Sequence, residues 1–226
     1  YLKGQRGSYD TSGEAKSGVA PGLQHKYEPT GLALVSNLCA GLCRECFRKL
    51  IFLDSNGTGA QATFPNEGAL QYIAKHKEMN SILLSGGDAL MLTDQSLEDI
   101  FTMLTHEDFS HIETIRLGTK VQCYYPQRIT PDLVELLTDF RAHSGKEVQV
   151  CVHYEHPREL NTASKEALKL MHEGGITQYN QTVYLQGINN DASTLYDLFA
   201  ELAQHGVRPY YLFQCRPVKG STHLAM

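Results

Sequence analysis

Apolar and polar positions follow two recurring patterns along the chain. Six short apolar runs rich in β-forming residues predict strands at 32–36, 82–85, 114–117, 148–152, 181–185 and 210–213. Between them, apolar residues spaced three and four positions apart predict amphipathic helices at 67–77, 95–104, 131–142, 163–173 and 192–204. Strands that alternate with helices in this way are parallel and joined by crossovers.

Residues typical of helix ends flank several of the predicted helices. Three residues of good N-cap type lie directly before a helix: Thr130, Asn161 and Asp191. Three glycines lie just beyond a helix, where a left-handed residue often ends it: Gly145, Gly174 and Gly206. These boundary residues support the same order of elements as the apolar pattern.

Two architectures fit this order, an open doubly wound sheet and a whole or partial (β/α) barrel. A full barrel has eight strand–helix units and typically about 250 residues. This chain has 226 residues and six predicted strands, so a partial (β/α)6 barrel fits its length best. In either architecture the functional side chains are expected at the carboxyl ends of the strands.

The chain divides into a lead-in arm and a core. Residues 1–26 contain several glycines and few apolar runs, and we expect an N-terminal arm there. Residues 27–226 contain every predicted strand and helix and are expected to form the barrel core. The chain begins with Tyr1 instead of Met and ends at Met226 directly after a motif, so we expect it to be part of a longer protein.

Composition and charge narrow the classes of function. Apolar residues make up 42% of the chain and charged residues 20%, as in ordinary globular domains. The net charge of −5 argues against a nucleic-acid-binding face. No apolar run reaches the roughly 20 residues of a membrane helix, and no secretory signal is visible. We therefore expect a cytoplasmic protein with no nucleic-acid or membrane partner.

Three of the six cysteines lie close together. Cys39, Cys43 and Cys46 are spaced by four and three residues in a glycine-containing loop directly after the first predicted strand. This clustering favours metal ligation in a reducing compartment over a disulfide scaffold. Iron–sulfur clusters and structural zinc sites usually take four ligands, so three cysteines imply an open coordination position. A zinc site with one histidine as fourth ligand is the structural alternative.

The remaining cysteines show no such spacing. They lie in or near predicted strands, where free thiols are usually buried and inert: Cys123, Cys151 and Cys215. We expect them to take no part in metal binding.

The cysteine spacing, followed by the aromatic Phe47, resembles the signature of the radical SAM superfamily. The resemblance implies that the three cysteines hold a 4Fe–4S cluster, whose fourth iron chelates the amino and carboxylate groups of S-adenosylmethionine (SAM). It also implies that the reduced cluster cleaves SAM to a 5'-deoxyadenosyl radical. In the superfamily, the backbone near the position of Phe47 touches the adenine of SAM.

A second motif supports the same resemblance. Ser85, Gly86, Gly87 and Asp88 close the second predicted strand and resemble the glycine-glycine-acid motif of the superfamily. Two glycines let the backbone approach a ligand closely, and the acid can meet an ammonium group. The resemblance implies that this segment binds SAM, although the same sequence by itself is only a weak signal for a turn.

Further motifs resemble lysine 2,3-aminomutase over nearly the whole chain, at 19–27, 128–130, 152–159, 180–181, 187–191, 209–212 and 220–224. This resemblance implies a partial (β/α)6 TIM-type barrel of the radical SAM type. It also implies that Arg48, His153 and Gln181 help to hold SAM. The aminomutases use pyridoxal phosphate (PLP) to hold the substrate amino group while the nitrogen migrates.

The sequence departs from the family pattern around PLP. Lys26 and Thr30 occupy positions where the family has two arginines near the PLP phosphate. Thr30 carries no charge, and the ammonium group of Lys26 cannot form the two parallel hydrogen bonds that a guanidinium group forms with phosphate. Glu45 replaces a histidine within the cysteine loop. The PLP-binding lysine of the family lies beyond the position of Met226. The use of PLP therefore stays open.

A further departure concerns the substrate. In the lysine enzymes an aspartate after the sixth strand meets the side-chain ammonium group of lysine, whereas this chain has Arg216 there. Because arginine binds carboxylate or phosphate, the reversed charge predicts an anionic, glutamate-like substrate. Lys26 and Arg216 are thus the candidate residues of a substrate or PLP pocket. A surface ion pair of Arg216 with a nearby acid is the alternative.

Together these observations predict a radical SAM enzyme that abstracts hydrogen from an amino-acid-like substrate and leads to 2,3-amino migration. A PLP-independent rearrangement, epimerisation or dehydration on the same scaffold is one alternative. A non-catalytic zinc or iron–sulfur module is another. The expected partners are a small-molecule substrate and an electron donor such as flavodoxin or ferredoxin, and a homo-oligomer is one possible assembly.

Overall fold

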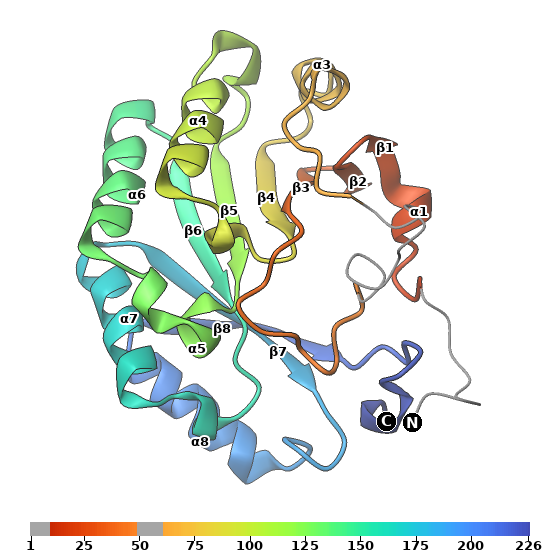
Figure 1. Ribbon diagram of the computed structural model, residues 1–226, viewed down its shortest axis with the longest axis vertical. Helices are drawn as coiled ribbons and strands as arrows, with labels where there is room; N and C mark the ends of the chain where they lie inside the picture. Colours follow the sequence, from red (N-terminus) through yellow and green to blue (C-terminus); the bar gives the residue numbers. More distant parts are fainter. Residues whose placement is uncertain (1–9, 49–60) are drawn as a thin grey trace.

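Figure 1 shows the computed structural model of the chain, which describes residues 10–48 and 61–226. Its strands form one open sheet in chain order. The first two strands, β1 (Gly18–Ala20) and β2 (Leu23–Tyr27), form an antiparallel hairpin that pairs with the third strand. The next six are parallel: β3 (Thr30–Ser36), β4 (Ser81–Gly86), β5 (Thr114–Thr119), β6 (Glu147–Val152), β7 (Thr177–Tyr184) and β8 (Val207–Gln214).

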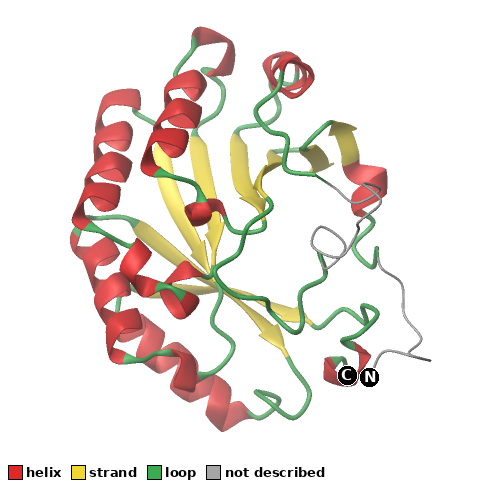
Figure 2. Cartoon of the chain, viewed as in Figure 1, coloured by secondary structure: helices red, strands yellow, loops and turns green. Residues whose placement is uncertain are grey.

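The α-helices of the described residues are α1 (Glu14–Ser17), α3 (Glu67–Lys75), α4 (Asp94–Leu104), α5 (Val121–Tyr124), α6 (Pro131–Ser144), α7 (Thr162–Glu173) and α8 (Ala192–Gln204). Figure 2, in the same view, shows α4, α6, α7 and α8 along the outer face of the curved sheet. In the described parts of the chain, no helix has the length and apolarity needed to span a bilayer.

This arrangement confirms the expected partial (β/α)6 barrel. Six parallel strands are joined by crossovers, and within the described residues β8 pairs with β7 alone, so the sheet stays open. Neighbouring strands place Ile82, Ile115 and Val148 in register, and all three are fully buried. Apolar residues from the helices, such as Leu97 and Leu133, belong to the same core.

The predicted helix boundaries are confirmed to within two residues at each end, and α8 spans the predicted range. Two strands begin three or four residues earlier than predicted, β7 at Thr177 and β8 at Val207. The buried positions of β7 carry the polar residues Gln178, Asn180 and Thr182. Because apolar residues are missing from these positions, the apolar pattern of the sequence does not indicate where β7 begins. Along β8 only Val207 is buried, because this last strand has a neighbour on one side only.

Most of the predicted helix ends are confirmed. All three predicted N-caps accept a hydrogen bond from a backbone N–H three residues along, at 2.9–3.2 Å: Thr130, Asn161 and Asp191. Two of the glycines are left-handed as expected: Gly145 and Gly206. The third prediction was wrong by one position, because Gly174 has φ −71° and the following Gly175 takes the left-handed conformation with φ 72°.

The described part of the expected arm, residues 10–26, carries regular structure. It contains α1 and the hairpin of β1 and β2, which extends the sheet on the outer side of β3. Leu23 of β2 is buried in the main core. The arm is therefore attached to the barrel through both backbone pairing and apolar contact.

Backbone contacts lock the carboxyl ends of β3 and β4 together. The N–H of Gly87 donates to the Ser36 carbonyl at 2.6 Å, and the N–H of Asp88 donates to the Leu38 carbonyl at 2.8 Å. Gly86 has φ 114°, a conformation that side chains rarely adopt. A Cβ on Gly87 would collide with the carbonyl oxygen of Leu38 and lie 2.9 Å from its carbonyl carbon. The two glycines therefore fix the start of the cysteine loop.

We expect Gly87→Ala to destabilise the protein, because the added Cβ must push the end of β4 away from Leu38. Overpacking of this kind costs about 1–3 kcal/mol. The free energy of unfolding, from urea denaturation followed by circular dichroism, measures the effect.

Gly68→Ala is the matched control. Gly68 lies in the first turn of α3, and the nearest atom to an added Cβ is in the Asn66 side chain, at 3.5 Å. Alanine should stabilise this helix by roughly 0.5–1 kcal/mol. Equal changes in the free energy of unfolding for the two substitutions would contradict the close contact between the ends of β3 and β4.

Candidate functional site

A cavity of about 280 Å³ lies at the carboxyl ends of the strands, where the barrel architecture places functional groups. The loop after β3 forms one wall, and residues at the ends of β4, β5 and β6 form the others. Ten residues predicted from the sequence line it: Cys39, Cys43, Cys46, Phe47, Arg48, Ser85, Gly86, Gly87, Asp88 and His153. The fold thus brings two motifs about 40 residues apart in the sequence to one place.

Three predicted site residues do not line this cavity. Gln181 lies within β7, Lys26 near the end of β2, and Arg216 after β8. The lining residues that the sequence analysis did not assign to the site include Lys120, Tyr124 and Glu155. Lys120 directly follows β5, so the rule that functional groups follow strand ends would have found it.

The side chains of the three clustered cysteines are partly exposed. Burial, followed by the carboxylate of Asp88, raises the pKa of the Cys39 thiol to about 12. Burial, followed by Glu45, raises that of Cys43 to about 12 as well. These thiols therefore keep their protons unless a bound metal cation stabilises the thiolates. Such a site is suited to metal ligation and unsuited to a free thiolate nucleophile.

The spacing of the sulfur atoms bears on the kind of metal. Three sulfurs on one tetrahedral zinc ion lie about 3.8 Å apart, given Zn–S bonds of about 2.3 Å. Among the described residues, the three cysteines do not form a group whose ligand atoms all lie within 4.8 Å of one another. The three sulfurs therefore do not have the close spacing that a single zinc ion requires.

Arg48 holds the end of the cysteine loop against two other elements. Its Nη1 donates to the Ser85 hydroxyl at 3.0 Å, and its Nε donates to the Glu14 carboxylate at 2.8 Å. The guanidinium also lies 4.9 Å from the centre of the Phe47 ring. Arg48 thereby links α1, the cysteine loop and the end of β4, and it places a positive charge in the wall of the cavity.

Asp88 is buried, and both of its carboxylate oxygens accept backbone hydrogen bonds. Oδ2 accepts from the N–H of Lys120 at 2.7 Å, and Oδ1 accepts from the N–H of Leu90 at 3.0 Å. Burial raises the pKa of this carboxyl, while its hydrogen bonds oppose the shift. The carboxylate of Asp88 therefore holds the end of β4 next to the end of β5.

A cluster of ionised side chains lies just after β5 and β6, and two of its members, Lys120 and Glu155, line the cavity. The Lys120 ammonium pairs with Glu155 and, at 3.0 Å, with Glu159. Burial alone would lower the pKa of Lys120, but the two carboxylates outweigh it and raise the pKa well above its usual value. Lys120 therefore stays charged next to the cysteine loop.

Tyr124 covers the cysteine loop from the side of α5. Its hydroxyl donates to Cys43 Sγ at 3.8 Å, and its ring leaves no room for a side chain on Gly41. Lys120 Nζ lies 5.5 Å from the centre of the same ring. The far end of the loop is also held, because the hydroxyl of Ser221 donates to the carbonyl of Arg44.

His153 follows β6 and faces the cavity with a neutral ring. Burial, then the positive charges of Lys120 and Arg48, lower its pKa to about 4. A hydrogen bond with the backbone of Gln181 opposes this shift. Near pH 7 the imidazole is therefore uncharged, so it can either donate or accept one hydrogen bond toward the cavity.

The two residues at the family's PLP-phosphate positions have other partners. The ammonium of Lys26 donates to the carbonyl of Ser12 at 2.9 Å, and the hydroxyl of Thr30 accepts from Arg116 at 3.1 Å. Neither residue lines the cavity. Arg216 is exposed after β8, and within the described residues its side chain forms no ion pair. The structure therefore does not gather these candidates into one pocket.

We expect Lys120→Met to destabilise the protein by about 3–5 kcal/mol, because it leaves Glu155 buried without its counter-charge. Adding Glu155→Gln should recover part of that loss, since the second change removes the stranded charge. Urea unfolding of both single variants and the double variant gives the coupling free energy. Additive effects would show that the two side chains do not act as a pair.

Sequence comparisons give relatives along nearly the whole chain, although no protein-family model matches it. The chain is 42% identical, over 95% of its length, to a provisionally named L-lysine 2,3-aminomutase of Aquifex aeolicus, and covers 57% of that protein. It is 36% identical over 90% of its length to the L-lysine 2,3-aminomutase of Acetoanaerobium sticklandii, covering 47% of it. It is 33% identical over 98% of its length to the glutamate 2,3-aminomutase of Clostridioides difficile, covering 50% of it.

The chain thus spans about half the length of the curated relatives it matches. Among solved structures it is similar to native anSMEcpe with bound AdoMet, with a TM-score of 0.57 and 15% identity, over 82% of this chain and 51% of that one. That similarity concerns the fold. The sequence relatives match nearly the whole chain, so over this length the chain is similar to proteins named L-lysine 2,3-aminomutase.

Proposed function

We propose that the chain is the cluster- and SAM-binding core of a radical SAM enzyme of the aminomutase type. The observation that carries the proposal is the cavity in which Cys39, Cys43 and Cys46 face the Gly86–Gly87 strand end. When bound, a 4Fe–4S cluster and SAM supply the one-electron chemistry that removes a hydrogen atom from an unactivated carbon. The named relatives are aminomutases, which supports this class of reaction.

The chain's own residues have distinct tasks in this proposal. The three cysteines hold the cluster, and the raised pKa values of the Cys39 and Cys43 thiols mean that metal binding releases the protons of these two residues. Arg48 and Lys120 hold the walls of the cavity in place through their ion pairs, Arg48 with Glu14 and Lys120 with Glu155 and Glu159. Neutral His153 offers a hydrogen bond without adding a charge.

Phe47 and the segment from Ser85 to Asp88 complete the proposed SAM site, with Gln181 contributing through its backbone contact to His153. Asp88 acts in this proposal by fixing the ends of β4 and β5, because its carboxylate oxygens are already engaged. Gly86 and Gly87 line the cavity, and their missing side chains let the end of β4 lie against the backbone of Ser36 and Leu38.

For the substrate we propose an amino-acid-like anion that undergoes 2,3-amino migration. The relatives are named for lysine and for glutamate, which are amino acids with a cationic and an anionic side chain, respectively. Arg216 is exposed, and no carboxylate of the described residues pairs with it, which leaves its charge available. An arginine at this strand end supports a substrate with a second carboxylate.

A PLP-independent reaction on the same scaffold is the second candidate. It is favoured by the partners of Lys26 and Thr30, which contact Ser12 and Arg116 and lie away from the cavity. In this alternative the same radical chemistry leads to another rearrangement, an epimerisation or a dehydration. An absorbance band from a PLP imine in the purified protein would decide for the aminomutase.

Several other expectations remain proposals. They are a flavodoxin or ferredoxin as electron donor, a homo-oligomeric state, a cytoplasmic location and a core that comprises residues 27–226. The non-catalytic zinc module is less well supported, because the thiols of the cysteine loop are spread more widely than a single zinc ion requires.

Cys43→Ala should abolish cluster assembly, because it removes one of three ligands. Iron content and the cluster absorbance after anaerobic reconstitution measure the loss. Cys123→Ala is the control, since this partly buried thiol lies in α5 and does not line the cavity. Wild-type iron content in Cys43→Ala would refute the ligand assignment.

Arg216→Asp should raise the KM for a dicarboxylic amino acid by at least about tenfold, because it replaces an attractive charge by a repulsive one. SAM cleavage without substrate should be unchanged. Arg208→Asp makes the same charge change near the opposite end of β8 and serves as the control. An unchanged KM of Arg216→Asp for the dicarboxylic amino acid would contradict the proposal that Arg216 binds an anionic substrate.

A further inference from the structure

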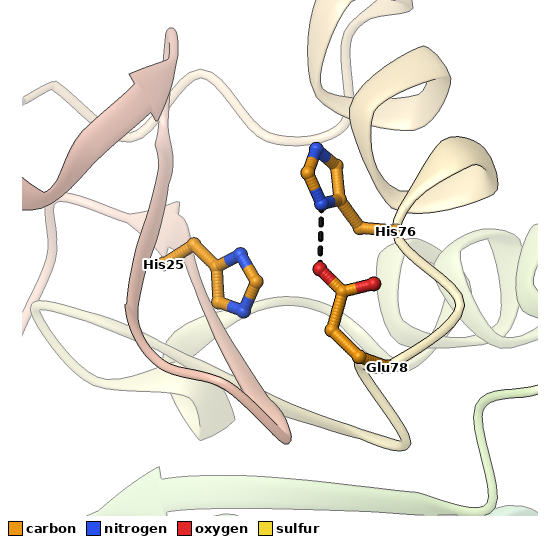
Figure 3. A group of neighbouring side chains, drawn as sticks. All are labelled: His25, His76 and Glu78. Carbon is orange, nitrogen blue, oxygen red and sulfur yellow. Dashed lines mark hydrogen bonds and ion pairs between the residues drawn. The ribbon is translucent and has the colours of Figure 1, made fainter.

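Two histidines and a glutamate come together at the edge of the sheet opposite to the cavity. Figure 3 shows His25 on β2 facing His76, which ends α3, and Glu78, which lies in the turn before β4. One ligand atom from each residue lies within 4.8 Å of the others. The residues come from segments about 50 positions apart, so the sheet and α3 create the group.

The hydrogen bonds of His25 determine which of its nitrogens is free to bind a ligand. Nε2 lies 2.9 Å from the carbonyl of Glu28, which can only accept, so Nε2 carries the proton. Nδ1 therefore has the lone pair, and it accepts from the Tyr72 hydroxyl at 3.1 Å. A histidine that donates one N–H to a backbone carbonyl and turns its other nitrogen inward has the arrangement typical of metal-binding histidines.

His76 and Glu78 form the other side of the group. His76 Nδ1 and Glu78 Oε1 are 2.7 Å apart and share one proton. The His76 ring stacks on Tyr72 with centroids 3.8 Å apart and an angle of 20°, and His25 meets both rings edge-on. Ring packing thus fixes the direction of both imidazoles, which lowers the entropy cost of holding a ligand.

We propose that His25, His76 and Glu78 bind a divalent transition-metal ion such as zinc. Two imidazoles and one carboxylate are a donor set that zinc accepts, with water as the fourth ligand. Magnesium and calcium prefer all-oxygen sites and are disfavoured. The ion takes the place of the proton between His76 and Glu78, and the Tyr72 hydroxyl turns away from His25.

The position of this site assigns it a structural role. β2 and β4 both pair with β3, and the turn that holds Glu78 leads into β4, so the ion would tie together the two strands that flank β3, at the edge where β3 and β4 begin. The cysteine loop leaves β3 at the opposite edge. Residues at this face of a barrel serve stability more than chemistry. Zinc should therefore stabilise the folded chain without taking part in the reaction.

The test compares zinc binding by the wild-type chain and by Glu78→Gln, a change at an exposed side chain. After equilibration with Zn²⁺ and dialysis, the wild type should retain one equivalent more than the variant. The unfolding temperature should rise with Zn²⁺ in the wild type and less in the variant. The variant should bind at this site at least about tenfold more weakly, since even outer partners of metal sites have effects of that size.

His106→Gln is the matched control. His106 and Asp108 form a histidine–acid pair of the same sequence spacing, with Nδ1 and Oδ2 3.3 Å apart, but they belong to no such three-residue group in the described chain. This variant should bind as much zinc as the wild type.

Cobalt as a probe separates this site from the cysteines. The difference spectrum between wild type and Glu78→Gln should show visible d–d bands without a thiolate-to-cobalt charge-transfer band. Equal zinc content and equal thermal shifts in the wild type and Glu78→Gln would overturn the proposal. A thiolate band in the difference spectrum would do so too, because it would assign the lost metal to the cysteine loop.

Discussion

The close approach of two backbones at the ends of β3 and β4 is the constraint on which the cavity depends. Without a side chain on Gly87, its N–H reaches the Ser36 carbonyl at 2.6 Å, and Asp88 then reaches Leu38. The Asp88 carboxylate continues the contact by accepting from the N–H of Lys120. Three neighbouring strand ends are therefore held by one set of hydrogen bonds, and the cysteine loop leaves them in a fixed direction.

Polar groups replace the apolar core toward this edge of the barrel. Asn180 is fully buried in β7, accepts from the N–H of Tyr154 and donates to its carbonyl and to Thr182. Glu155 and Lys120 pair beside it. Burying such groups is costly unless they are hydrogen-bonded, so a satisfied network of this kind specifies one arrangement of the strand ends. The rigidity of the proposed cofactor site follows from this network.

The two edges of the sheet have different chemistry for a geometric reason. Parallel strands point all their carboxyl ends to one side, where loops of different length and residue type can meet. At the other side the strands begin, and the connections are short turns such as the one that carries His76 and Glu78. Side chains there meet through sheet pairing, so they are suited to holding strands together.

The sequence by itself determined what depends on local rules. Helix ends follow from capping residues such as Thr130, and the proposed ligand set follows from the spacing of the three cysteines, because neighbouring residues control both. Only the tertiary structure decided the partners of Asp88 and Lys120, the inverted pattern of β7 around Asn180, and the separation of Lys26 from the cavity. These depend on strand pairing between distant segments, and no local pattern in the sequence records which distant backbone a side chain will meet.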